Sequence, residues 1–388
     1  MENARQGEVR MATSLRMTPA EAATGAALDA AAPFFLSPSG LDSLLSRLAA
    51  TSAVYAPARV GSALHYKRFT GYSSEMVLDG VRATQPIKSF FFSARQRLAY
   101  YFSGNGGNVG AGGATTIVGA KACDLHSLAV LDSVFAGGRF KDPSYQAKRH
   151  ASLIISSDCS EPSMSCFCSV VGHKPYAESG FDLNLSPVSG GFQAEVGSEK
   201  GERLVRQNAD LFTSPSEAAG TEREEACART LEQVQMRNEA FVFDMPLHDI
   251  VKRNLESSVW AKLARRCVGC AACEMVCPTC HCFLIFDQAI AGRFEKHRVW
   301  DSCHQAGFAR AAGGGNPRPQ AADRFKSRFI HKFVFFPETE GFLGCTGCGR
   351  CVEACLAGID LRETLQELAA SRQESLVGQS LRTTASGR

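Results

Sequence analysis

The sequence predicts an α+β fold, in which an N-terminal α/β domain precedes a mainly helical, cysteine-rich domain. Three observations predict it. Short runs with strand character alternate with amphipathic helical segments up to about residue 210. From about residue 225 the apolar spacing becomes helical. Half of the 16 cysteines then fall in two regular runs near the C-terminus.

The N-terminal elements follow from apolar spacing and turn residues. Helices are expected over 41–50 and 123–135, where leucines recur at helical intervals. Short strands are expected over 53–57, 89–93, 115–120 and 150–159. The glycine-rich stretch 104–113 matches neither common phosphate-binding motif, so it is interpreted as a surface loop.

Changes in composition suggest four parts of the chain. Residues 1–30 are expected to be a mobile tail, and 31–224 an α/β domain that docks partners. The polar stretch 213–224 resembles a linker. Residues 225–371 form the second domain, which ends in a helix with Asp360 as N-cap and Glu363 completing a capping box. Residues 372–388 are a polar tail.

Charge and hydropathy exclude several classes of protein. A net charge of +3 is too small to indicate a nucleic-acid partner. No apolar stretch is long enough for a membrane span, and no secretory signal is visible. Sixteen cysteines in a chain of this length then indicate metal binding in a reducing compartment, which predicts a cytoplasmic protein.

The two cysteine runs have the same spacing. CVGCAACEMVCP and CTGCGRCVEACL each space four cysteines by two, two and three residues. Such a doubled run is the signature of a protein that holds two [4Fe–4S] clusters. Zinc is the competing interpretation, but its sites usually pair two C-x2-C units. The cysteines are Cys267, Cys270, Cys273 and Cys277 in the first run, and Cys345, Cys348, Cys351 and Cys355 in the second.

In two-cluster ferredoxins the fourth cysteine of each run ligates the other cluster. The first cluster would therefore take Cys267, Cys270, Cys273 and Cys355. The second would take Cys345, Cys348, Cys351 and Cys277. This exchange makes 225–371 one ferredoxin-like folding unit. The piece between the two runs is rich in Gly, Pro and Arg and is expected to loop over the clusters.

Residues next to the ligands have expected roles. Arg265, Arg266 and Arg350 either offset cluster charge or are solvated surface residues. Glu274 and Glu353 are expected at exposed helix positions. Small residues would let backbone N–H groups approach the sulfurs: Gly269, Ala271, Ala272, Gly347 and Gly349.

Eight cysteines lie outside the runs. Cys280, Cys282 and Cys303 would pack around the clusters, and Cys227 looks incidental. The remaining four could form a further metal site or could be buried as small hydrophobic residues. They are Cys123, Cys159, Cys166 and Cys168.

Longer motifs extend the pattern beyond the cysteines. PTCHCF, WDSCH, GGGNPR and HKF accompany the runs, and GAKACDLHSLAVLD and CSEPSMSCFC lie upstream. With these motifs, residues 50–365 resemble the β subunit of cytoplasmic sulfhydrogenases, which are NiFe hydrogenase and sulfur reductase complexes. The A component of anaerobic sulfite reductase is similar. The sequence has Ala271 where the family usually has Gly, and Leu356 where Pro is usual.

The resemblance implies an electron-transfer subunit with two [4Fe–4S] clusters. It would pass single electrons between a catalytic subunit of the NiFe-hydrogenase or sulfite-reductase type and a flavin- and NAD(P)-linked subunit. No catalytic residue is assigned, because no Ser-His-Asp or paired-carboxylate arrangement is evident. An iron–sulfur redox sensor is the alternative, although no helix-turn-helix or basic stripe supports it. An enzyme acting at the upstream cysteines is a third option.

Overall fold

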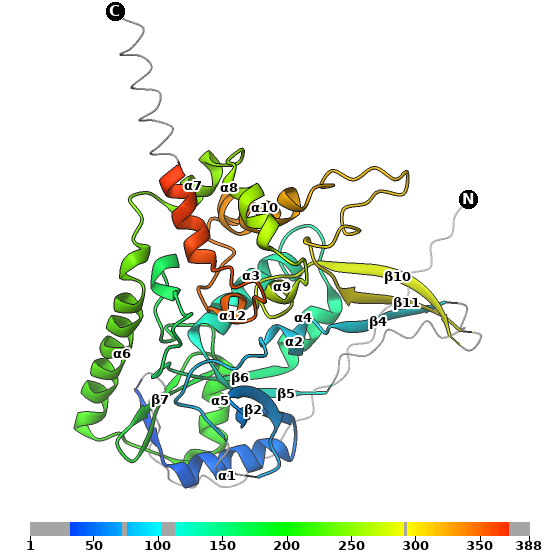
Figure 1. Cartoon of the computed structure of the whole chain (residues 1–388). Helices are drawn as coiled ribbons and strands as arrows, with labels where there is room; N and C mark the ends of the chain where they lie inside the picture. The colour runs from blue at the N-terminus through cyan, green and yellow to red at the C-terminus, as the bar shows by residue number, and fades with distance from the viewer. Residues whose placement is uncertain (1–31, 72–75, 102–112, 291–292, 372–388) are drawn as a thin grey trace, which may run out of the picture.

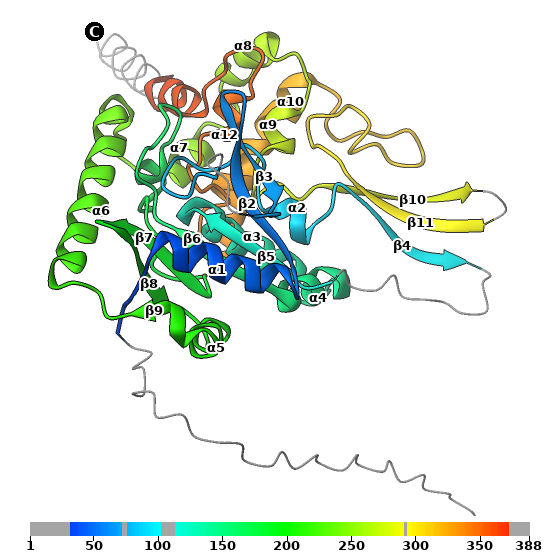
Figure 2. The same cartoon turned by 90° about the horizontal axis from the view of Figure 1, so that it is seen from below.

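The structure, a computed structural model, describes residues 32–71, 76–101, 113–290 and 293–371. The expected tails over 1–30 and 372–388 lie outside these residues, as does most of the expected loop 104–113. The α+β fold class is confirmed, because two sheets combine with helices on both sides of the larger one (Figures 1 and 2). No helix in the described ranges has both the length and the apolar character needed to cross a bilayer.

The larger sheet has eight strands in the order β3-β2-β5-β6-β7-β8-β1-β9. Its centre is parallel, from β2 through β5 and β6 to β7, and the remaining pairs are antiparallel. The strands are β1 (Phe34–Leu36), β2 (Ala53–Val60), β3 (Ala63–Arg68), β5 (Thr115–Ala120), β6 (Ser152–Ser157), β7 (Leu183–Val188), β8 (Gly191–Val196) and β9 (Phe212–Thr213).

Helices cover this sheet on both faces. In β5, Val118 belongs to the apolar cluster that contains residues of α1 (Pro38–Ala49), whereas Ile117 belongs to the cluster of α3 (Ala122–Phe135). Successive residues of a strand point to opposite faces, so the two clusters are the two sides of one sheet. Three short helices complete this part: α2 (Lys88–Phe91), α4 (Pro143–Ala151) and α5 (Glu199–Gln207). Two 3₁₀ turns also belong to this part. The turn η1 (Cys168–Val171) lies between β6 and β7, and η2 (Ala209–Leu211) lies between α5 and β9.

A three-stranded antiparallel sheet extends from the body (Figure 1). It consists of β10 (Phe283–Ile290), β11 (Arg293–Trp300) and β4 (Arg95–Tyr101). Because β4 comes from the N-terminal half and pairs with β11, the two halves of the chain share this sheet.

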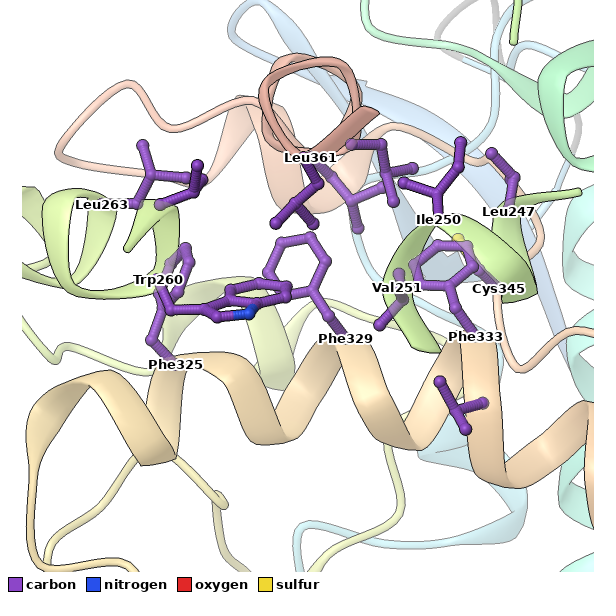
Figure 3. Close-up of a cluster of buried hydrophobic side chains, with 14 of the residues drawn as sticks. Leu247, Ile250, Val251, Trp260, Leu263, Phe325, Phe329, Phe333, Cys345 and Leu361 are labelled. Atoms are coloured by element: carbon purple, nitrogen blue, oxygen red, sulfur yellow. The ribbon is translucent and has the colours of Figure 1, made fainter. Parts of the chain in front are cut away.

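The remaining helices lie in the second half of the chain. They are α6 (Glu217–Arg237), α7 (Leu247–Arg253), α8 (Val259–Arg266), α9 (Ala272–Met275), α10 (Ala321–Ile330), α11 (Phe336–Glu340), α12 (Arg350–Glu353) and a helix over 361–371. The 3₁₀ turn η3 (Glu239–Phe241) follows α6, and the π-helical turn η4 (His331–Phe335) continues α10. Figure 3 shows their core, in which Phe325, Phe329 and Phe333 face Trp260, Leu361 and the residues of α7.

Three expectations differ from the structure. The segment 89–93 is not a strand. It contains most of the short helix α2 and the residue that caps it, and the side chains of Phe91 and Phe92 are buried. The piece between the runs is not only a loop, because it contains the hairpin β10–β11. The expected boundary after residue 224 falls inside α6, which begins at Glu217 and runs through the polar stretch without interruption.

Candidate metal centre

The two cysteine runs have the same backbone conformation. Gly269 and Gly347 occupy the left-handed region at equivalent positions, with φ of 68° and 64°. Two residues later Ala271 and Gly349 do the same, with φ of 59° and 75°. In the described ranges Ala271 is the sole non-glycine residue with positive φ. A short helix, α9 or α12, then follows in each run, so both runs wrap in the same way.

The structure brings the fourth cysteine of each run toward the other run. Burial raises the pKa of Cys273 to about 12, and Cys351 and Cys355 of the second run contribute. Burial likewise raises the pKa of Cys345 to about 12, with contributions from Cys351 and from Cys277 of the first run. This proximity supports the exchanged ligand sets, which stay a prediction. Cys277, Cys345, Cys348 and Cys351 are buried, Cys267, Cys273 and Cys355 are half-buried, and Cys270 is exposed.

Two buried cations lie among these thiols, and neither was predicted from the sequence. Lys332 Nζ lies 3.4 Å from Cys277 Sγ and donates to Thr279 Oγ1 at 2.6 Å. Burial lowers the pKa of Lys332, but the nearby Cys277 and Cys280 are among the groups that raise it. The net shift is above the usual lysine value, so Lys332 stays protonated. Burial lowers the pKa of Arg328, but the thiols of Cys351 and Cys273 are among the groups that raise it, and the net shift is upward. The HKF motif contains Lys332, and this was the available sequence signal.

Helical spacing explains how one segment serves both the core and the thiols. In the segment formed by α10 and η4, Phe325, Phe329 and Phe333 recur every four residues and enter the apolar core (Figure 3). Arg328 and Lys332 recur at the same interval on an adjacent face. Residues four apart lie one above the other on a helix, so the sequence places two positive charges along the thiols.

The three arginines beside the ligands separate into two kinds. Arg350 is 1% exposed and pairs with Asp124 of α3 at 2.8 Å. Arg265 and Arg266 are exposed, as the solvated-surface alternative expected. A further cation, Lys88 of α2, donates to the carbonyl oxygens of Glu274 and Cys280 at 3.3 and 2.9 Å.

The expectation that Glu274 is exposed is wrong. Its side chain is 1% exposed, and the hydroxyl of Ser302 donates to it. Cys303 Sγ lies 2.9 Å from the same carboxylate, and His304 Nε2 lies 3.6 Å away. Burial raises the pKa of Glu274, but His304 and these donors lower it below the usual value. The WDSCH motif therefore anchors the first run through Glu274. Glu353, by contrast, is exposed as expected.

The other nearby cysteines pack against the runs, as expected. Cys280 hydrogen-bonds to Cys277, and Cys282 hydrogen-bonds to Cys303. A cavity of about 690 Å³ opens beside Cys282 and Cys303. His281 and His331 also line it, and burial lowers the pKa of each to about 4.

The upstream cysteines form a separate group. Cys123, Cys159, Cys166 and Cys168 line one cavity next to Cys348 of the second run. Cys227 is apart from them, with its Sγ 3.8 Å from Asp158 Oδ2. All 16 cysteines are free thiols.

The donors fit two [4Fe–4S] clusters. Each cubane needs four thiolates, and the two runs supply eight cysteines around buried cations that would balance thiolate charge. Across the described residues, no three His, Cys, Asp or Glu side chains converge on one point as a single zinc ion requires. Thiols spread around a volume suit a cluster, whose iron corners each take one ligand.

The geometry thus defines a dicluster iron–sulfur protein. Residues 266–359 match the family described as the 4Fe-4S dicluster domain, so the cofactor prediction of two [4Fe–4S] clusters is confirmed at the level of the domain. The β subunit of sulfhydrogenase 2 from Pyrococcus furiosus is 33% identical over 327 residues, which cover 83% of this chain and 94% of that subunit. The chain belongs to the sulfhydrogenase β-subunit family. No solved structure matches it.

Proposed function

We propose that this protein is the electron-transfer subunit of a multisubunit cytoplasmic oxidoreductase. It relays single electrons through two [4Fe–4S] clusters, between a catalytic subunit of the hydrogenase or sulfur/sulfite-reductase type and a flavin- and NAD(P)-linked subunit. The observation that carries the proposal is the meeting of two equally folded cysteine runs around Arg328 and Lys332. The name of the Pyrococcus relative supports the assignment to a sulfhydrogenase.

The residues of this chain have three tasks in the relay. The cysteines of the two runs would hold the clusters, which supply one-electron redox chemistry when bound. The exchange of fourth ligands would keep the clusters close. Lys332 and Arg328 place positive charge where added electrons would accumulate, which stabilises the reduced state.

The first run offers a surface where a partner can approach. Cys270 is exposed, and the apolar side chains of Val268 and Leu356 are 65% and 79% exposed. All three are ligands of the first cluster or neighbours of its ligands under the exchanged assignment. An electron would therefore enter or leave at this surface. The sixteen free thiols are consistent with the reducing conditions of the cytoplasm.

The test uses the assembled complex, purified anaerobically through a tag on this chain. Addition of NAD(P)H should produce the electron paramagnetic resonance signals of reduced [4Fe–4S] clusters in freeze-quenched samples. Cys270→Ala should abolish electron transfer from NAD(P)H to the terminal acceptor, while dye reduction by the flavin subunit continues. Cys227→Ala, the matched control, should keep both activities. Full physiological turnover in Cys270→Ala would refute the relay.

A further inference from the structure

Four cysteines outside the two runs converge on one cavity. Cys123 lies in the first turn of α3, Cys159 follows β6, and Cys166 and Cys168 lie before and at the start of η1. All four line the cavity, together with Cys348 of the second run. The room there for a water-sized sphere is about 20 Å³, within about 360 Å³ of space not filled by atoms, part of which is open solvent. Three separated segments thus deliver thiols to one place.

The cavity lies where α/β sheets commonly bind ligands. Strands β5 and β6 are parallel neighbours at the centre of the larger sheet. Cys123 comes three residues after β5 ends at Ala120, and Cys159 two residues after β6 ends at Ser157. In open α/β sheets, ligands bind outside the carboxyl ends of the strands. The cavity therefore lies at the carboxyl ends of two central strands of the sheet.

The segment that contains Cys166 and Cys168 is fixed directly on the second run. Phe167 N donates to Gly347 O at 2.8 Å, and Cys166 Sγ lies 3.9 Å from Cys348 O. A Cβ at Gly347 would lie 2.5 Å from the Cα of Cys168, so the two backbones touch. A group bound in this cavity would be an immediate neighbour of the second cluster.

Two buried cations line the same cavity. Lys121 is 2% exposed, and its Nζ donates to the carbonyl oxygens of Leu78 and Asp158 at 2.5 and 2.9 Å and to the hydroxyl of Ser157 at 3.1 Å. These acceptors are neutral. Arg82 is 4% exposed, donates to Cys348 O, and forms an ion pair with Glu353 at 2.9 Å. The carboxylates of Asp158 and Asp79 also lie near Lys121. Metal-bound thiolates would add further negative charge beside both buried cations.

The surroundings do not suit cysteines that serve only as small apolar residues. The four thiols share their cavity with the side chains of Lys121 and Arg82. Metal binding deprotonates a thiol and balances the charge. A single zinc ion does not fit, because in the described part of the chain no three ligands converge on one point.

We propose that Cys123, Cys159, Cys166 and Cys168 bind a third [4Fe–4S] cluster. Its four iron corners each take one thiolate, and the four thiols release their protons on assembly. The cluster takes up one electron from the neighbouring cluster at Cys348 and gives it up again, with no bond made or broken. The electron-carrying role of this cluster rests on the proposed relay, whereas the binding site itself does not. The cluster would extend the electron path from the dicluster domain into the N-terminal sheet.

Metal content of the full-length chain, purified anaerobically without the partner subunits whose own iron would add to the count, tests the proposal. Wild type should contain about twelve irons and twelve acid-labile sulfides in this chain, and Mössbauer spectra should show only [4Fe–4S] iron. Cys159→Ala and Cys166→Ala should each lower the content to about eight, with the signals of the other two clusters retained. Cys227→Ala should keep about twelve.

Three results would overturn the third site. They are about eight irons in wild type, variants with unchanged iron, and one zinc beside eight irons. The iron content of the wild-type protein tests the third site even if a variant fails to fold. A count of about eight, with the electron transfer described above intact, would refute the third cluster alone. A count below eight would instead refute the two-cluster relay.

Discussion

Arg350 Nη2 lies 2.8 Å from Asp124 Oδ1, and both side chains are fully shielded from solvent. Arg350 belongs to the second cysteine run, whereas Asp124 lies in the first turn of α3 beside Cys123. Arg350 Nε also donates to Ala83 O at 2.9 Å. This buried ion pair therefore joins the dicluster domain to the N-terminal sheet and fixes the relative position of the two cysteine groups.

Removal of Arg350 alone should be strongly destabilising. Arg350→Met leaves the Asp124 carboxylate buried without a partner, which costs about 3–5 kcal/mol. The double variant Arg350→Met/Asp124→Asn should recover most of this loss, because no charge then remains unpaired. Anaerobic urea unfolding measures the shift in midpoint. Arg266→Met, an exposed arginine beside the first run, is the matched control and should shift little. Equal losses in the single and double variants would contradict the argument.

A second prediction concerns Ala271 and Gly349, which have the same left-handed conformation in the two runs. Ala271→Gly should stabilise the protein by roughly 0.5–1 kcal/mol. Glycine removes the steric cost of the left-handed conformation, and this gain exceeds the additional chain entropy that glycine loses on folding. Gly349→Ala should destabilise it by roughly 2–5 kcal/mol through strain and overpacking. A Cβ at Gly349 would lie 2.3 Å from Ser165 O. Thermal denaturation under anaerobic conditions measures both, and opposite signs are expected.

Prediction from the sequence succeeded where the interactions are local. Apolar spacing was enough to predict the helix at 123–135. Cysteine spacing was enough to predict a dicluster domain, because the spacing of the ligands is itself the signal. It failed at 89–93, where an aromatic stretch with strand propensity forms α2 because Phe91 and Phe92 are buried in the tertiary core. It also failed at Glu274, whose partners Ser302 and Cys303 lie about thirty residues away.

The grouping of the upstream cysteines could be suggested but not established from sequence. Cys123 and Cys159 meet because β5 and β6 are neighbours in the sheet, and strand order is not visible in local spacing. The charge environment was invisible for the same reason. Arg82 and Lys121 lie far from the cysteine runs in sequence, and Arg328 and Lys332 could be recognised only once α10 was placed over the runs.

A third prediction concerns the Lys332 ammonium, 3.4 Å from Cys277 Sγ. Lys332→Met should lower the reduction potential of the second cluster, because a buried positive charge that stabilises the added electron is lost. The shift should be on the order of 60–180 mV, since a charge at this distance shifts a protonation equilibrium by about one to three units and a tenfold change is about 59 mV for one electron.

Potentiometric titration followed by electron paramagnetic resonance measures the Lys332→Met shift. Lys252→Met is the control, because Lys252 is exposed and pairs with Glu338 at 2.5 Å. Its potentials should match those of wild type. An unchanged or raised potential in Lys332→Met would show that the ammonium does not act on the cluster.

The last prediction tests the exchange of ligands between the runs. If Cys355 completes the first cluster, Cys355→Ala must perturb the same cluster as Cys267→Ala, although Cys355 belongs to the second run. Cys277→Ala must likewise perturb the cluster of Cys345→Ala. The proximity of Cys273 to Cys355, and of Cys345 to Cys277, is the structural basis. Electron paramagnetic resonance of the reduced variants should therefore group them in pairs across the runs. Grouping within each run would mean that each run encloses its own cluster and that the two runs fold around separate centres.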